Sequence, residues 1–135
     1  MTTTVINLLN ALRTHLSVFE IPVPCSAHLT TYSTDSEEPQ VSMQLARHQL
    51  PEITRGLLGW ADTLTEVTAE AWRVPSGDSV HLSVIGRLPE GVLIRVYSGV
   101  PFTQNGISCD LAPDTSTTLP LAVLREWAAP GEVTP

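Results

Sequence analysis

Lysine is absent from this chain of 135 residues, and its seven cationic side chains are all arginines, set against fourteen carboxylates. The absence excludes a Schiff-base lysine, the phosphate-binding lysine of a P-loop and the strand lysine of a protein kinase. Arginine keeps its charge and suits bidentate recognition of a carboxylate or phosphate rather than proton transfer. Any anion recognition therefore falls to arginine, although an arginine-only composition is also what a GC-rich genome tends to encode.

Cysteine is almost as scarce, and its two positions, Cys25 and Cys109, form no CxxC pair. We expect both thiols to be reduced, small and buried. The histidines show neither the close helical spacing nor the cysteine partners of zinc motifs; they are His15, His28, His48 and His81. The sequence therefore predicts no metal site, no cofactor and no catalytic residue.

Long apolar runs are also missing. No stretch approaches the roughly 18 residues that span a bilayer, and the first residues lack the basic leader and long apolar core of a signal peptide. We therefore expect a cytoplasmic protein without a membrane partner. A net charge of -7 makes a poor surface for displacing counterions from phosphate, so we expect no non-specific nucleic-acid binding.

Hydrophobic residues make up 42% of the chain, and their periodicity predicts one α+β domain over residues 1–128 with a flexible tail at 129–135. Thr3 or Thr4 can cap a first helix that ends at about Phe19. Strands at 25–32 and 41–45, joined by a polar turn at 33–39, predict a hairpin. A second helix begins at Pro51, and its Gly56 and Gly59 predict close packing against another element.

From Thr65 the period changes to two, and strands at 65–72, 80–87 and 92–97 predict a meander. Thr118, with Pro120 close behind, opens a short last helix that carries Leu121, Leu124 and Trp127. The predicted architecture is a five-stranded antiparallel sheet in the order α-β-β-α-β-β-β-α, with the helices mainly on one face.

The meander aligns polar side chains on the sheet face opposite the core. If three residues connect its last two strands, Leu88 faces Val92 and Val84 faces Val96. This register gathers the candidate ligand or interface residues on one face: Trp72, His81, Ser83, Ile85, Arg87, Leu93, Arg95 and Tyr97. Two interpretations stay open: the arginines grip a carboxylate or phosphate, or they pair with Glu66 and Glu70 on an ordinary solvated face.

Three segments between Arg55 and Val100 carry a resemblance: Leu-Gly-Trp-Ala-Asp-Thr-Leu at 58–64, Ala-Trp-Arg at 71–73 and Val-His-Leu-Ser at 80–83. They resemble a block in small proteins of Streptomyces-type actinobacteria, some of them associated with phage-like or integrated elements. The resemblance covers about a third of the chain closely and the leading α-β-β part loosely. It implies no particular activity and transfers no catalytic residue, but it agrees with the arginine-only composition.

An apolar strip formed by Trp72, Ile85 and Leu93 within a polar rim is typical of a partner interface. We therefore expect a non-enzymatic accessory or interaction module that binds another protein or itself, by this face or by the last helix with Trp127. The alternative is a small-molecule or anion-binding protein or enzyme that uses His81, Arg87 and Arg95. A deep pocket around those three residues would favour the alternative, and a flat face whose arginines are held by glutamates would favour the interface.

Overall fold

The computed structural model describes residues 4–31, 38–47, 49–104 and 106–129. Most of the predicted turn at 33–39, nearly all of the predicted tail at 129–135 and His48 lie outside these ranges. No helix within them is long and apolar enough to cross a membrane.

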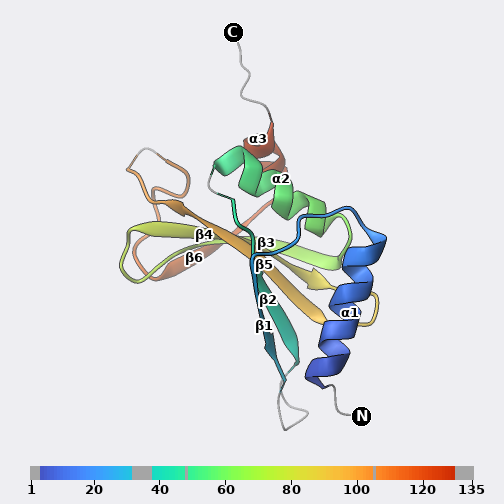
Figure 1. Cartoon of the computed structure of the whole chain (residues 1–135). Coiled ribbons are helices and arrows are strands. Elements are labelled where there is room, and N and C mark those ends of the chain that lie inside the picture. The colour runs from blue at the N-terminus through green and yellow to red at the C-terminus, as the bar shows by residue number, and fades with distance from the viewer. Residues whose placement is uncertain (1–3, 32–37, 48, 105, 130–135) are drawn as a thin grey trace.

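Three helices and six strands occupy the described residues (Figure 1), which confirms the predicted α+β class. In chain order they are α1 (Val5–Val18), β1 (Ser26–Thr30), β2 (Gln40–Gln44), α2 (Leu50–Ala61), β3 (Thr65–Arg73), β4 (Ser79–Arg87), β5 (Leu93–Pro101), β6 (Thr115–Leu119) and α3 (Leu121–Ala128).

Strand β6 corrects the predicted count of five strands. It pairs antiparallel with β3 at the sheet edge, and α3 begins at Leu121 rather than at Thr118. The sequence of β6 is Thr-Ser-Thr-Thr-Leu, and four of its five residues are exposed. Threonine is β-branched and favours extended backbone, but a strand that is polar on both faces shows no alternation of polar and apolar residues. The periodicity therefore did not reveal it.

The predicted antiparallel sheet is also wrong in one ladder. The strand order is β1-β2-β5-β4-β3-β6, and β2 runs parallel to β5. The pairing sets Val41 opposite Ile94 and Met43 opposite Val96, and all four side chains are fully buried. Because α2 separates β2 from β3 in the chain, the first hairpin is free to dock at the far side of the meander, where it buries these apolar residues.

The three helices pack on one face of the sheet, as predicted (Figure 1). Leu8 of α1, Trp60 of α2 and Leu124 of α3 belong to a single buried cluster with Val84 and Val96 of the sheet. The indole Nε1 of Trp60 donates to the carbonyl of Pro22 at 2.9 Å, which ties the segment after α1 to α2. The opposite sheet face carries no helix from the described residues.

Candidate functional site

The face without helices is built by alternate residues of β2, β5, β4 and β3, and we call it the open face. The predicted register of the meander is confirmed, because Val84 pairs with Val96 and Ser83 with Tyr97. The open face carries Ser42, Glu70, Trp72, His81, Ser83, Ile85, Arg87, Leu93, Arg95 and Tyr97. The eight candidate residues of the three-stranded meander therefore share this face as predicted, Glu66 lies in an irregularity of β3, and Trp127 lies on α3 and packs against the core.

Three aromatic rings form the centre of the open face. The His81 and Tyr97 rings stack with centroids 5.3 Å apart, and the Trp72 ring meets His81 edge-on at 5.4 Å. The indole Nε1 of Trp72 donates to Asp114 Oδ1 at 3.3 Å, which fixes the plane of that ring. Burial, and then the nearby charge of Arg95, lower the pKa of His81 below 6.5. The imidazole is therefore neutral at pH 7.

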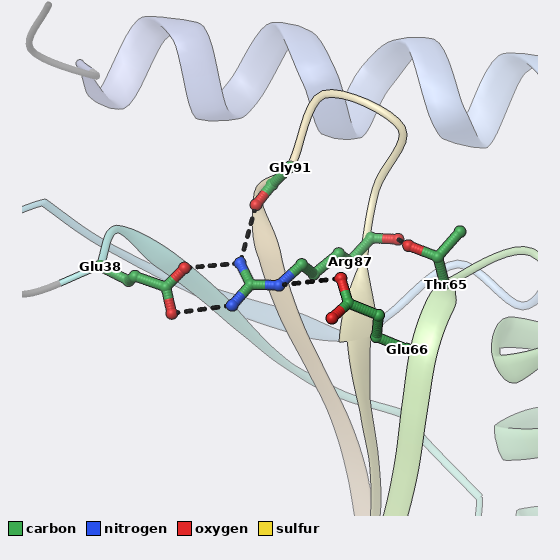
Figure 2. A network of polar contacts seen from close by, with 5 residues as sticks. All are labelled: Glu38, Thr65, Glu66, Arg87 and Gly91. Carbon is green, nitrogen blue, oxygen red and sulfur yellow. Dashed lines mark hydrogen bonds and ion pairs between the residues drawn. The ribbon is translucent and has the colours of Figure 1, made fainter.

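Arg87 lies at one end of the face and is fully engaged (Figure 2). Its Nη1 and Nη2 donate to the two carboxylate oxygens of Glu38 at 2.5 and 3.0 Å, and Nη1 also donates to the carbonyl of Gly91 at 3.0 Å. The predicted partner Glu66 approaches Nε at 3.6 Å. The hydrogen bonds from Arg87 lower the pKa of Glu38, and the same pair raises the pKa of Arg87. This arginine is a structural clamp between the loop before β2 and the β4 to β5 turn.

Arg95 is different, although it also has the predicted glutamate beside it. Its Nη2 lies 3.8 Å from Glu70 Oε1, which is an ion-pair distance but too long for a hydrogen bond. Within the described residues its guanidinium makes no hydrogen bond, and it lies 5.9 Å from the centroid of the Tyr97 ring. The side chain is half-buried, at 33% exposure, so this positive charge is only partly hydrated and loosely paired.

An open hollow of about 270 Å³ lies at the centre of the open face. It is lined by Ser42, Trp72, His81, Arg95 and Tyr97. Arg87 is not among the lining residues, so His81 and both arginines do not converge on one pocket. A second open hollow, of about 540 Å³, lies beyond His81 where β2 ends and β4 begins, and its wall includes Arg47 and Gly99.

Ser83 does not reach either hollow. Its hydroxyl is buried and has no hydrogen-bond partner in the part of the chain that the structure describes. Cross-strand neighbours Glu70 and Tyr97 flank it in the register. Of the predicted candidates, Ser83 is therefore part of the packing beneath the face and cannot contact a ligand without a rearrangement.

Both cysteines are exposed, which contradicts the prediction that they are buried. Cys25 precedes the edge strand β1, whose first three residues are exposed, and its thiol lies 3.3 Å from the carbonyl of Gln44. His28 of β1 and His81 of β4 are separated by two strands and do not meet. Across the described residues no group of three or more His, Cys, Asp or Glu could hold a metal ion.

Three residues of the site were not predicted: Ser42, Glu38 and Asp114. Ser42 meets Arg95 only because β2 runs beside β5, and Asp114 meets Trp72 only because β6 pairs with β3. Glu38 lies in a segment that looked like a solvated turn. Each contact depends on a long-range strand pairing that a single sequence does not encode as a local pattern.

A scan against protein-family models and searches of the curated proteins and of the solved structures found no match to this chain.

Proposed function

We propose that this protein is a non-enzymatic interaction module that associates through its open face, and that its partner is a second copy of the same chain. One observation carries the proposal. Trp72, Ile85, Leu93 and Tyr97 are half-buried side chains with large apolar surfaces, and they lie together on the sheet face that no helix of the described residues covers.

The composition of this face supports an interface. The centres of protein interfaces are enriched in Trp, Tyr and Arg, and their rims are polar. Here the aromatic cluster of Trp72, His81 and Tyr97 is central, and the ion pairs of Arg87 lie at one end. Because most of these side chains are already held by contacts within the chain, association would cost little additional side-chain entropy.

The distribution of charge favours a second copy as the partner. The whole chain carries -7, so two copies repel each other over most of their surfaces. The open face carries both signs, with Arg87 and Arg95 beside Glu66 and Glu70. A face with both signs can be complementary to itself across a two-fold axis, since the loosely paired Arg95 of one copy can meet a glutamate of the other.

The alternative, an anion site built on His81, Arg87 and Arg95, has narrower support. The guanidinium of Arg87 is occupied by Glu38 and Gly91 and lies outside the hollow that His81 and Arg95 line. Of the two arginines, Arg95 is the one whose guanidinium makes no hydrogen bond within the described residues, and it lines the hollow together with His81.

Light scattering coupled to size-exclusion chromatography tests the proposed function. The wild type is expected to reach twice its monomer mass of 14.6 kDa as the concentration rises. Leu93→Glu places a carboxylate in the apolar strip, opposite Arg87 in the ladder. Burying this added charge in an interface costs free energy, so the variant is expected to be a monomer at every concentration. Ile6→Glu, the same kind of change at a 67% exposed position of α1, is expected to leave the association unchanged. A wild type that stays monomeric, or a dimer that survives Leu93→Glu, contradicts the proposal.

A further inference from the structure

We infer that the hollow lined by Ser42, Trp72, His81, Arg95 and Tyr97 is a binding site for a small planar aromatic carboxylate. In this assignment the Arg95 guanidinium pairs with the carboxylate, and the ring of the ligand packs against the aromatic wall. The inference goes beyond the proposed interface, since it assigns a small-molecule ligand to the middle of the same face.

The guanidinium of Arg95 supplies the recognition of charge. Arginine carries five N–H donors in a planar fork that matches a carboxylate. Arg87 spends its donors on Glu38 and Gly91, whereas Arg95 makes no hydrogen bond within the described residues. A half-buried cation with unused donors gains more from a carboxylate than a fully solvated one, because less water competes for it.

The aromatic residues supply the recognition of a ring. His81 and Tyr97 stack, Trp72 stands edge-on to His81, and the hydrogen bond from Trp72 to Asp114 holds the arrangement in place. Aromatic pairs prefer such offset or edge-to-face contacts, and a planar ring in the hollow can extend the same kind of packing. Because burial and the charge of Arg95 lower the pKa of His81, the imidazole is neutral and adds a polar contact without a second positive charge.

Size and charge narrow the class of ligand. The hollow of about 270 Å³ falls at the small end of ligand sites, which suits a molecule with a single ring. Ser42 lies opposite Arg95 in the parallel ladder and offers a hydroxyl on the β2 side of the hollow. Glu70 lies on the β3 side, 3.8 Å from Nη2, and partly balances the charge of Arg95, so each negative charge that a ligand adds beyond the first is unfavourable. A monocarboxylate therefore fits better than a phosphate or a dicarboxylate.

Titration of benzoate into the ¹⁵N-labelled protein tests the assignment by NMR. Saturable shifts are expected at the Trp72 indole and at the amides of Arg95 and Tyr97. Two control ligands separate shape from charge: benzamide has the shape of benzoate without its charge, and benzylamine carries the opposite charge. Neither is expected to produce these shifts at the same concentration. Arg95→Gln is expected to weaken benzoate binding by about tenfold or more, the usual loss for a hydrogen-bonded charge. Tyr97→Leu, which removes the ring but keeps an apolar side chain, is expected to weaken it as well.

Arg87→Gln is the matched control, because it removes an arginine from the same face but not from the hollow, and benzoate affinity is expected to stay the same. The titration is repeated in Leu93→Glu, whose altered residue does not line the hollow, so binding is measured independently of self-association. Benzoate that fails to saturate in both proteins overturns the inference. So does equal binding by benzamide, or Arg95→Gln binding as tightly as the wild type.

Discussion

Ser83 and Ser98 are both buried serines, but their hydroxyls have opposite surroundings. The Ser98 hydroxyl is 3.1 Å from the carbonyl oxygens of both Leu45 and Arg47, and it fixes the chain where β2 ends. The Ser83 hydroxyl has no partner among the described residues. A buried polar group without a hydrogen bond costs about 1–3 kcal/mol, whereas a satisfied one contributes about 0.5–1.5 kcal/mol.

The two serines therefore respond oppositely to alanine. Ser83→Ala removes an unsatisfied hydroxyl and is expected to leave the free energy of unfolding unchanged or to raise it by about 1 kcal/mol. Ser98→Ala removes the hydroxyl donor that the buried Leu45 carbonyl shares with the part-buried Arg47 carbonyl, and it is expected to lower the free energy of unfolding by about 1–2 kcal/mol. Urea denaturation followed by tryptophan fluorescence measures both. If Ser83→Ala lowered the free energy of unfolding as much as Ser98→Ala, the Ser83 hydroxyl would have a hydrogen-bond partner.

At the scale of residues, the sequence predicted most of the side chains of the open face and the two glutamates Glu66 and Glu70 beside its arginines, but not Ser42 or Glu38. Alternation along β4 and β5 is a local pattern, and it placed Arg87 and Arg95 within reach of Glu66 and Glu70. It could not distinguish the two arginines. That distinction comes from Glu38, which reaches Arg87 from a segment 49 residues earlier in the chain.

At the scale of elements, the glycines of α2 show how tightly the helix approaches its neighbours. A Cβ at Gly56 would lie 2.9 Å from Cδ1 of the buried Leu45, whereas a Cβ at Gly59 would lie 3.8 Å from Pro22, an ordinary contact. The predicted close packing of α2 is therefore confirmed at Gly56 and is looser at Gly59.

Alanine substitutions separate the two effects. Gly59→Ala is expected to raise the free energy of unfolding by up to about 1 kcal/mol, because alanine favours the helix. Gly56→Ala gains the same helix propensity, but the new methyl group must displace Leu45 in a packed core, where overpacking costs about 1–3 kcal/mol. Its net effect is therefore expected to be a lower free energy of unfolding. Thermal and urea denaturation of both variants check the order, and equal gains at the two positions would mean that Leu45 moves aside freely.

Helix α1 is docked through a buried histidine. His15 Nε2 lies 2.7 Å from Thr63 Oγ1, and that hydroxyl donates to the carbonyl of Trp60 at 2.8 Å, so Nε2 donates the hydrogen of this contact. Burial lowers the pKa of His15 from 6.5, and the nearby Glu90 raises it by a smaller amount. The folded protein therefore favours the neutral ring.

The sign of the pH dependence follows from that shift. Because the unfolded chain binds the proton more tightly, the stability contributed by neutral His15 is fully present above pH 6.5 and is lost as the pH falls through the lower folded pKa. Urea denaturation at pH 7.5 and at pH 5 is expected to show a smaller loss of stability in His15→Gln than in the wild type. An equal or larger loss of stability in His15→Gln would mean that the pH dependence arises from groups other than His15.

The elements themselves were predicted as far as local patterns allow. Thr4 caps α1 by accepting from the backbone N–H of Asn7 at 3.1 Å, and Pro51 lies in the first turn of α2, both as expected. Strand β6 was not predicted, because Thr115 to Thr118 form no apolar face. The parallel pairing of β2 with β5 was not predicted either. It depends on packing between residues that are far apart in the chain, such as Val41 and Ile94.

At the scale of the whole molecule, the three helices among the described residues cover one face of the sheet and leave the other open, and the function we propose depends on this asymmetry (Figure 1). The chain has a net charge of -7, and two of its arginines lie together with aromatic residues on the open face. Two copies can therefore attract each other through this face, while the acidic remainder of their surfaces repels. Because the chain has no lysine, arginine carries the positive charge of this face, and among the described residues of the face the arginines are Arg87 and Arg95.

The most direct test of the account is an NMR experiment on a mixture of isotope-labelled and unlabelled protein, which detects only proton contacts between copies. We predict contacts from the side chains of Trp72, Ile85, Leu93 and Tyr97 of one copy to the open face of the other, and none from Ile6 of α1. Contacts that arise only from α1, or a complete absence of contacts at a concentration where light scattering finds a dimer, would contradict the central claim.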